Sequence, residues 1–284
     1  MAVPPFDALT AAEASVFEKA LEARRFARGS EIATDGGLLV LSEGAIGLSV
    51  RTARGDEPLM DLAGGDFLGE IVLFEPEPVV LRAVAQSDSS CYSLERQSLL
   101  NVFRYSRTGA VKCMGLFARS LSRKIRAAND LLKKSPPSAS SVPEPARPLA
   151  ERDLDRVKAL SVVRREPAGT VIFKEGDESQ ELFIIGEGDI EIVKDAASAT
   201  PLVLARLGQG DFFGEMAFVD REPRSASAVA RTAVELHVVP AGALERLPEL
   251  HIGTAIYLAN VTCKIMARRL NATLKRFSYG RPVN

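Results

Sequence analysis

The hydrophobic positions of this chain form short runs and long periodic stretches, and the two kinds alternate in the same order twice. Short apolar runs bounded by glycine and polar residues are typical of strands. They predict strands near 38–41, 46–50, 84–94, 182–185, 190–193 and 229–239. Many short strands separated by Gly-rich turns favour a β-roll or jelly roll in each half.

Each half ends in a stretch whose apolar residues recur at helical spacing. These residues are Met114, Phe117, Leu121, Ile125 and Leu132 in the first half and Leu258, Val261, Ile265, Leu270 and Phe277 in the second. Shorter helices are predicted at 11–25 and 150–160, ahead of the strands. The predicted fold class is therefore mainly β with flanking helices, as two β-roll (jelly-roll) domains that are each closed by a long C-terminal helix.

The two halves also match each other in sequence. GDFLGE at 65–70 aligns with GDFFGE at 210–215, a shift of 145 positions. The same shift aligns LSRKIRAANDLL at 121–132 with MARRLNATLKRF at 266–277. Blocks that recur in the same order at one period indicate an internal duplication.

The length of 284 residues is enough for two domains of ordinary size. Proline and serine dominate 135–148, a composition typical of an extended linker. We therefore predict a first domain at 1–134, a linker at 135–148 and a second domain at 149–284.

The repeated block of the second half carries residues suited to a small anion attached to a sugar. It reads GDFFGEMAFVDREPRSASAVA over 210–230. Gly214 has no Cβ, so backbone there can approach a ligand closely, and a short helix starting after it would present free N–H groups to a phosphate. Arg224 offers a planar fork of donors for phosphate oxygens. A carboxylate would repel a phosphate, so Glu215 is better suited to accept hydrogen bonds from a sugar hydroxyl.

This block resembles the phosphate-binding cassette of cyclic nucleotide-binding domains, whose pattern is roughly F-G-E-(L/M)-A, a variable loop, then (P)-R-(A/S/T)-A-(S/T). The resemblance covers nearly the whole chain, twice, and implies that Glu215 holds the ribose 2′-hydroxyl and Arg224 the cyclic phosphate. The ligand-binding residues that it implies are Phe213, Gly214, Glu215, Met216, Ala217, Arg224, Ser225, Ala226 and Ser227. The alternative is that the block forms only a tight turn between two strands of a β-roll.

The first copy departs from the family pattern at the phosphate site. Gly69 and Glu70 are retained, but Val79 stands where the second copy has its arginine, and Val80 stands where it has the first serine. Losing several polar contacts to a phosphate at once removes most of its binding energy. We expect this degenerate first site not to bind a cyclic mononucleotide well, unless Arg82 substitutes from a shifted position.

The closing helix of the second copy gives a hint about the base. It resembles that of the bacterial catabolite activators, in which a threonine meets the adenine amino group, and Thr273 falls at that place. The alternative is an ordinary helix-surface threonine. Ser225, directly after Arg224, resembles both cyclic-GMP-selective kinase sites and bacterial cyclic-AMP activators. We favour cyclic AMP as the ligand, with cyclic GMP and cyclic dinucleotides left open, and expect no further cofactor.

Composition and charge restrict the partners and the location. Lys and Arg number 36 and Asp and Glu 37, so the net charge of −1 gives no general attraction to nucleic acid or membrane. The closing helices are locally basic. This charge could form a face for nucleic acid or for an acidic partner, but we favour the interpretation that it is the solvated side of an amphipathic helix. Three cysteines without CxxC spacing, and no signal peptide or membrane segment, favour a cytoplasmic protein. The high Ala, Arg and Val usage is compatible with a bacterial source.

Three functions remain open on these grounds. We favour a cyclic nucleotide receptor or adaptor that binds ligand in its second domain and repositions the closing helix towards an unknown protein partner. The alternatives are a ligand-independent interaction scaffold and a nucleic-acid binder. Only seven residues follow Phe277, too few for a helix-turn-helix output module, and two histidines in unrelated contexts argue against a metal enzyme. The closing helices could pair two chains as a homodimer, or the two domains could pair within one chain.

Overall fold

The computed structural model describes residues 9–34, 37–52, 55–79, 81–134, 155, 158, 161–242 and 251–278. The chain divides into two compact units. The first is Met1–Ala139 with Leu270–Asn284, and the second is Ser140–Arg269. The linker predicted at 135–148 lies outside the described residues, as does the helix predicted at 150–160 apart from Asp155 and Lys158.

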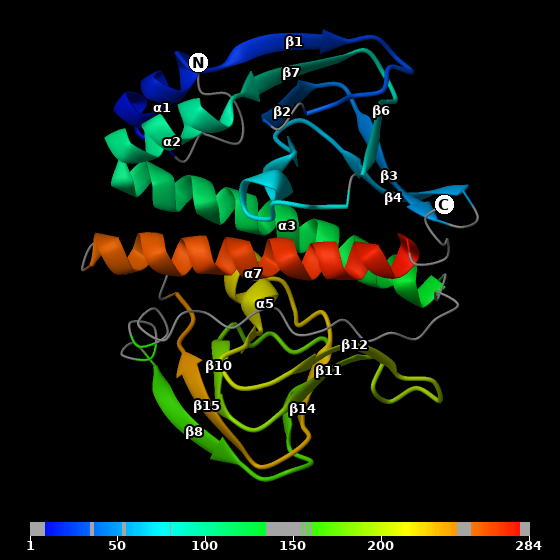
Figure 1. Ribbon diagram of the computed structural model, residues 1–284, viewed down its shortest axis with the longest axis vertical. Coiled ribbons are helices and arrows are strands. Elements are labelled where there is room, and N and C mark those ends of the chain that lie inside the picture. Colours follow the sequence, from blue (N-terminus) through cyan, green and yellow to red (C-terminus); the bar gives the residue numbers. More distant parts are fainter. Residues whose placement is uncertain are drawn as a thin grey trace. The chain divides into compact units, whose positions relative to one another are not determined.

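The first unit contains two antiparallel sheets and a set of helices. Its elements are α1 (Ala11–Glu18), β1 (Glu22–Phe26), β2 (Leu38–Glu43), β3 (Ile46–Thr52), β4 (Gly55–Leu62), β5 (Phe67–Leu68), η2 (Glu70–Leu73), β6 (Arg82–Ala85), β7 (Ser89–Leu94), α2 (Arg96–Tyr105) and α3 (Arg107–Lys134). The strand orders are β1-β7-β2-β5 and β4-β3-β6. Helix α3 packs against η2 and β4 (Figure 1).

The second unit repeats this plan. Its elements are β8 (Val162–Glu166), β9 (Val171–Phe173), β10 (Leu182–Glu187), β11 (Ile190–Lys194), β12 (Leu202–Leu207), β13 (Phe212–Phe213), α5 (Glu215–Asp220), β14 (Ser227–Ala230), β15 (Val234–Val239) and α7 (Ile252–Ser278). The strand orders are β13-β10-β15-β8 and β12-β11-β14-β9. Helix α7 begins in this unit and ends in the stretch that groups with the first.

The two units have the same topology strand for strand, which is the structural record of the duplication. The sheet β1-β7-β2-β5 corresponds to β8-β15-β10-β13, and β4-β3-β6 corresponds to β12-β11-β14. Strand β9 of the second unit pairs with β14. At the corresponding place in the first unit, a single β-bridge joins Glu31 to Val84. The long helices α3 and α7 start at residues 107 and 252, again 145 apart.

The core of each unit lies between its two sheets. Strand β3 shows why: Ile46, Leu48 and Val50 are buried and alternate with less buried residues, so one face of the strand points inward. The core of the second unit includes the aromatic residues Phe183 and Phe213, whose rings stack at a centroid distance of 4.9 Å. Two open sheets with a shared core and flanking helices confirm the predicted mainly β, jelly-roll-like fold.

The predicted helix at 11–25 was wrong in its second half. Helix α1 ends at Glu18, and Glu22–Phe26 forms strand β1, paired with β7 from Glu22–Ser93 to Phe26–Ser89. Pairing with a strand more than 60 residues away overrides the local helical preference. Strands β4, β5, β8, β9, β12 and β13 and helix α2 were also not predicted.

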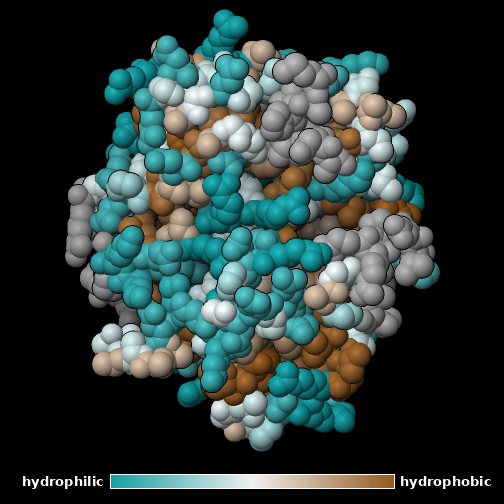
Figure 2. Space-filling view, turned by 180° about the vertical axis from the view of Figure 1, so that it is seen from behind, coloured by the Kyte–Doolittle hydropathy of each residue, from teal (hydrophilic) through white to brown (hydrophobic). Residues whose placement is uncertain are grey.

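The surface mixes hydrophilic and hydrophobic residues, as the face in Figure 2 shows. Among the described residues, the large hydrophobic side chains that are exposed are Leu100, Tyr105, Val162, Val163 and Val171. None of the described helices combines the length and apolar character needed to cross a membrane.

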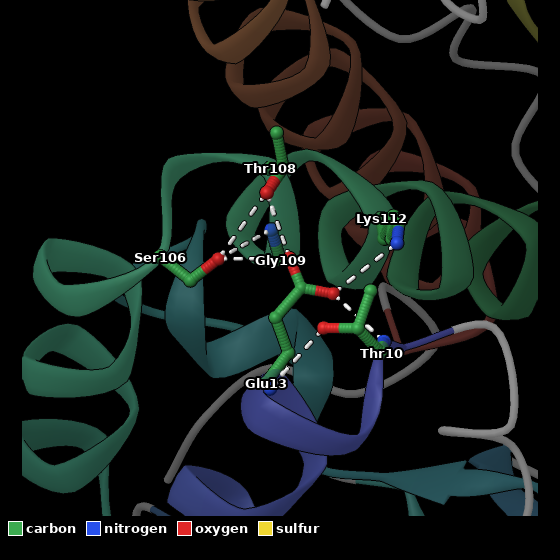
Figure 3. Close-up of polar contacts among 6 residues, drawn as sticks. All are labelled: Thr10, Glu13, Ser106, Thr108, Gly109 and Lys112. Atoms are coloured by element: carbon green, nitrogen blue, oxygen red, sulfur yellow. Dashed lines mark hydrogen bonds and ion pairs between the residues drawn. The ribbon is translucent and has the colours of Figure 1, made fainter.

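A carboxylate ties the first helix of the first unit to the junction of α2 and α3 (Figure 3). Glu13 forms a capping box with Thr10. Its carboxylate also accepts hydrogen bonds from Ser106 Oγ (2.9 Å) and Thr108 Oγ1 (2.7 Å) and pairs with Lys112 Nζ (3.2 Å). Burial alone would raise the pKa of Glu13, but these donors and the Thr10 N–H outweigh it and lower the pKa from 4.5 to about 2.

We expect Glu13→Gln to destabilise the first unit at neutral pH, and the effect to fade in acid. Because the folded-state pKa lies below the unfolded one, the carboxylate stabilises the fold above pH 4.5, and this contribution is lost as the pH falls towards 2. The loss at pH 7 should be about 2 kcal/mol. Urea unfolding of both proteins between pH 7 and pH 3 measures it, and exposed Glu18→Gln is the matched control. A difference that stays constant with pH would contradict the assignment.

Candidate functional site

In the second cassette, the side chain of Arg224 lies directly against the backbone at Gly214. Gly214 lies between β13 and α5 with φ of +79°, a left-handed conformation that favours glycine. A Cβ placed there would lie 2.6 Å from Nη1 of Arg224 and 2.9 Å from the Glu181 carbonyl oxygen. Only glycine therefore fits at this position, and it brings the arginine against the cassette backbone.

Arg224 lies beneath that glycine and is almost completely enclosed by protein. Its Nη1 donates to the Gly214 carbonyl (2.9 Å), its Nη2 to the Glu181 carbonyl (3.0 Å) and its Nε to Ser179 Oγ (3.0 Å). The guanidinium lies over the Phe173 ring at 4.1 Å. Burial lowers the pKa of Arg224, while the carboxylate of Glu181 acts to raise it.

Glu215, the first residue of α5, is buried and has one oxygen in an ion pair. Its Oε1 accepts from Nη1 of Arg269 on α7 (2.5 Å), and Nη2 of the same arginine donates to the Phe212 carbonyl (2.9 Å). The other oxygen, Oε2, is buried and has no hydrogen-bond partner among the described residues. A buried carboxylate oxygen without a donor is expensive, by about 1–3 kcal/mol. Glu215 Oε2 is therefore the acceptor of the cassette that a further donor would stabilise.

The remaining predicted residues of the second cassette are buried or hydrogen-bonded within it. The ring of Phe213 is fully buried, and Met216, Ala217 and Ala226 are buried as well. The hydroxyl of Ser225 donates to the Met216 sulfur (3.3 Å). The hydroxyl of Ser227 accepts from the Glu175 N–H (2.9 Å). The structure thus brings together Gly214, Glu215 and Arg224, and Ser227 is the first residue of the strand that follows, β14.

The first unit contains the same pairing of a cassette glutamate with a cation of the closing helix. Glu70 forms an ion pair with Lys124 of α3 and accepts from Ser120 Oγ (2.7 Å). Lys124 also donates to the Phe67 carbonyl (2.8 Å). Lys124, Glu70 and Phe67 stand 145 positions before Arg269, Glu215 and Phe212, so the pairing is duplicated together with the fold.

The positions that replace the arginine in the first unit offer no charge. The N–H of Val79 donates to Asn271 Oδ1 (2.8 Å), and both residues belong to the first unit. Val80 lies outside the described residues. Arg82, the possible substitute, pairs instead with Asp56 (3.0 Å) and Glu31 (3.3 Å). Gly69 keeps the left-handed conformation of its counterpart, with φ of +93°.

Thr273 is buried and lies on α7 one turn after Arg269, in the stretch that groups with the first unit. Its contact with a bound base remains a prediction. The sequence interpretation missed the role of Arg269 and Lys124, although the 145-residue shift already aligned both with each other and could have identified them.

Several cations of the closing helices are paired with carboxylates of the same chain. Lys112, Arg123, Lys124 and Arg269 pair with Glu13, Asp66, Glu70 and Glu215 respectively. The basic character of these helices therefore serves in part to hold acidic residues of the same chain. In the described part of the chain, no three His, Cys, Asp or Glu residues come together as metal ligands would.

Comparison with known proteins identifies the family. The profile of the cyclic nucleotide-binding domain matches residues 24–106 and 163–251. The chain therefore belongs to the family of proteins with cyclic nucleotide-binding domains, and it contains two of them.

Named relatives come from eukaryotes and bacteria. A cAMP-dependent protein kinase regulatory subunit of Blastocladiella emersonii is 25% identical over 75% of this chain and 48% of its own length. A cyclic AMP receptor protein of Thermus thermophilus is 36% identical over 31% of this chain and 41% of its own length. The regulatory domain of Toxoplasma gondii PKA, solved with cAMP, is 17% identical, with a TM-score of 0.33 over 89% of each chain. This chain spans less than half the length of the curated relatives it matches.

Proposed function

We propose that the second domain binds a cyclic nucleotide, with cyclic AMP preferred, and that the protein is a non-catalytic cytoplasmic receptor or adaptor. The observation that carries this proposal is the buried, unpartnered Oε2 of Glu215. A ribose 2′-hydroxyl is a donor of the right kind for it, and a charged acceptor makes that hydrogen bond stronger than a neutral one. The ligand would thus satisfy an atom that the described protein leaves without a partner.

Arg224 supplies the charge that the cyclic phosphate needs, one short helix away from Glu215. The resemblance of the cassette and the names of the relatives, a cyclic AMP receptor protein and cAMP-dependent kinase regulatory subunits, support the choice of ligand. Thr273 is the proposed partner of the adenine amino group, and cyclic GMP is the competing ligand. The first domain lacks the arginine and is proposed not to bind.

The closing helix is the proposed route from ligand to partner. Arg269 of α7 holds the same carboxylate that would accept from the ribose, so a ligand on Oε2 acts on a group already tied to that helix. A ligand changes a conformational equilibrium only through contacts that differ between the two states. The proposed partner is a protein, as the names of the kinase regulatory subunits suggest.

Calorimetric titration of ligand-free protein with cyclic AMP, cyclic GMP and cyclic di-GMP tests this proposal. We expect one mononucleotide to bind per chain. Glu215→Gln should weaken binding by about tenfold or more, because a hydrogen bond to a charged group contributes roughly 1.5–3 kcal/mol. The control is Glu222→Gln, an exposed acid between α5 and β14. No heat with any nucleotide in folded protein would favour the scaffold, and salt-dependent binding of DNA would favour the nucleic-acid binder.

A further inference from the structure

The guanidinium of Arg224 is occupied on every side in the structure. Only 1% of its side chain is exposed. Two backbone carbonyls and a serine hydroxyl accept from it, and the Phe173 ring covers one face at 4.1 Å. A phosphate arriving from solvent must therefore displace one of these neighbours before it can reach the fork.

The Glu181 carboxylate differs from the other neighbours of Arg224 because it is charged and partly exposed to solvent. The carboxylate of Glu181 lies with Oε2 at 3.3 Å from Nη2 of Arg224, and its side chain is 40% exposed. In the described part of the chain it is the one carboxylate within ion-pair distance of this arginine. The other acceptors are two backbone carbonyls, which the fold holds in place, and the uncharged, partly buried hydroxyl of Ser179. The Glu181 side chain can instead turn out into water with little loss.

We propose that Glu181 is an internal counter-anion that competes with the ligand phosphate for Arg224 and so sets the affinity of the second domain. This inference rests on the proposed function and adds the residue that tunes it. The Glu181 carboxylate and the ligand phosphate would both accept from the planar N–H donors of Arg224, and the two negative groups would repel each other there. In the absence of ligand, the carboxylate neutralises a buried cation that would otherwise be unpaired.

An orienting role for Glu181 would have the opposite consequence. If the carboxylate served mainly to aim the arginine at the phosphate, its removal would weaken binding. The geometry favours competition, because the two carbonyl contacts at 2.9 and 3.0 Å already fix the guanidinium and are shorter than the carboxylate contact. The sign of the change in affinity therefore separates the two roles.

The test is a titration of the full chain with cyclic AMP and with cyclic GMP, comparing wild type with Glu181→Gln. Glutamine keeps the size of the side chain and removes its charge. We expect binding to tighten about three- to fivefold, the scale of one partly exposed ion pair. Glu178→Gln removes the same charge from an exposed site three residues away. Because solvent and salt screen a charge that does not contact Arg224, this variant should leave the affinity within about a factor of 1.5.

Each outcome decides a separate question. Tighter binding in Glu181→Gln alone supports the competitor role, as does binding that appears only in this variant. Equal or weaker binding in a variant that melts like wild type overturns this inference and leaves the proposed function standing. Equal tightening in both glutamine variants assigns the effect to general charge and also overturns it. If no form of the protein binds either nucleotide, the proposed function and this inference fall together.

Discussion

Arg224→Ala should abolish cyclic nucleotide binding and at the same time destabilise the second domain. The substitution removes the positive fork proposed for the cyclic phosphate, which should weaken binding at least a hundredfold, given several charge-assisted contacts. It also removes one donor each from the Glu181 carbonyl and from the Gly214 carbonyl, which still accepts from the Phe218 N–H (3.2 Å), and it uncovers the Phe173 ring. We expect a loss of about 2–4 kcal/mol in the free energy of unfolding. The substitution affects the fold as well as the proposed ligand site because the arginine is buried.

Binding and stability must be measured on the same samples to separate the two effects. Calorimetry at low temperature, where circular dichroism shows the variant folded, gives the affinity, and urea unfolding gives the stability. The matched control is Arg231→Ala, an arginine whose side chain is 62% exposed. Nucleotide affinity equal to wild type in folded Arg224→Ala would show that the cassette has been assigned wrongly.

Lys124→Met should destabilise the first unit by about 3–5 kcal/mol. The ion pair that it breaks is buried, with the Lys124 side chain 4% and the Glu70 side chain 1% exposed. The substitution leaves a carboxylate in the interior with Ser120 Oγ as a remaining donor, and an uncompensated buried charge is costly. Replacing both partners removes both charges, so Glu70→Gln with Lys124→Met should recover most of the loss.

A double-mutant cycle by urea unfolding tests this pair, with hydrogen exchange of α3 peptides to assign the effect to the first unit. Arg119→Met, an exposed position of the same helix, is the control for the change of a cation to methionine. A single variant that loses less than about 1 kcal/mol, or a double variant as unstable as the sum of both single ones, would show that the pair does not act as a buried unit.

The correspondence between the two domains has a functional meaning. Both keep a glutamate at the start of the cassette, and both hold it with a cation of the closing helix, Lys124 in one and Arg269 in the other. Only the second domain adds an arginine under the cassette glycine. The pairing of glutamate with the closing helix is thus common to the duplicated fold, whereas the proposed ligand site needs the arginine as well.

The sequence by itself determined the duplicated plan, the strands with a clear apolar pattern, the two closing helices and the spacing of Gly214, Glu215 and Arg224. These features are local or repeat at one fixed shift, so periodicity and alignment of the chain with itself reveal them. The same local reading failed at Glu22–Phe26, where pairing with β7 decides the conformation.

The tertiary structure alone decided which groups meet across long stretches of chain. Arg269 reaches Glu215 over 54 positions, Glu181 reaches Arg224 over 43, and Ser106, Thr108 and Lys112 gather around Glu13 from more than 90 positions away. No pattern within a single segment encodes such contacts, because they depend on how packed sheets and helices place side chains in space. The unpartnered oxygen of Glu215 is of the same kind, since burial and the missing donor exist only once the chain is folded.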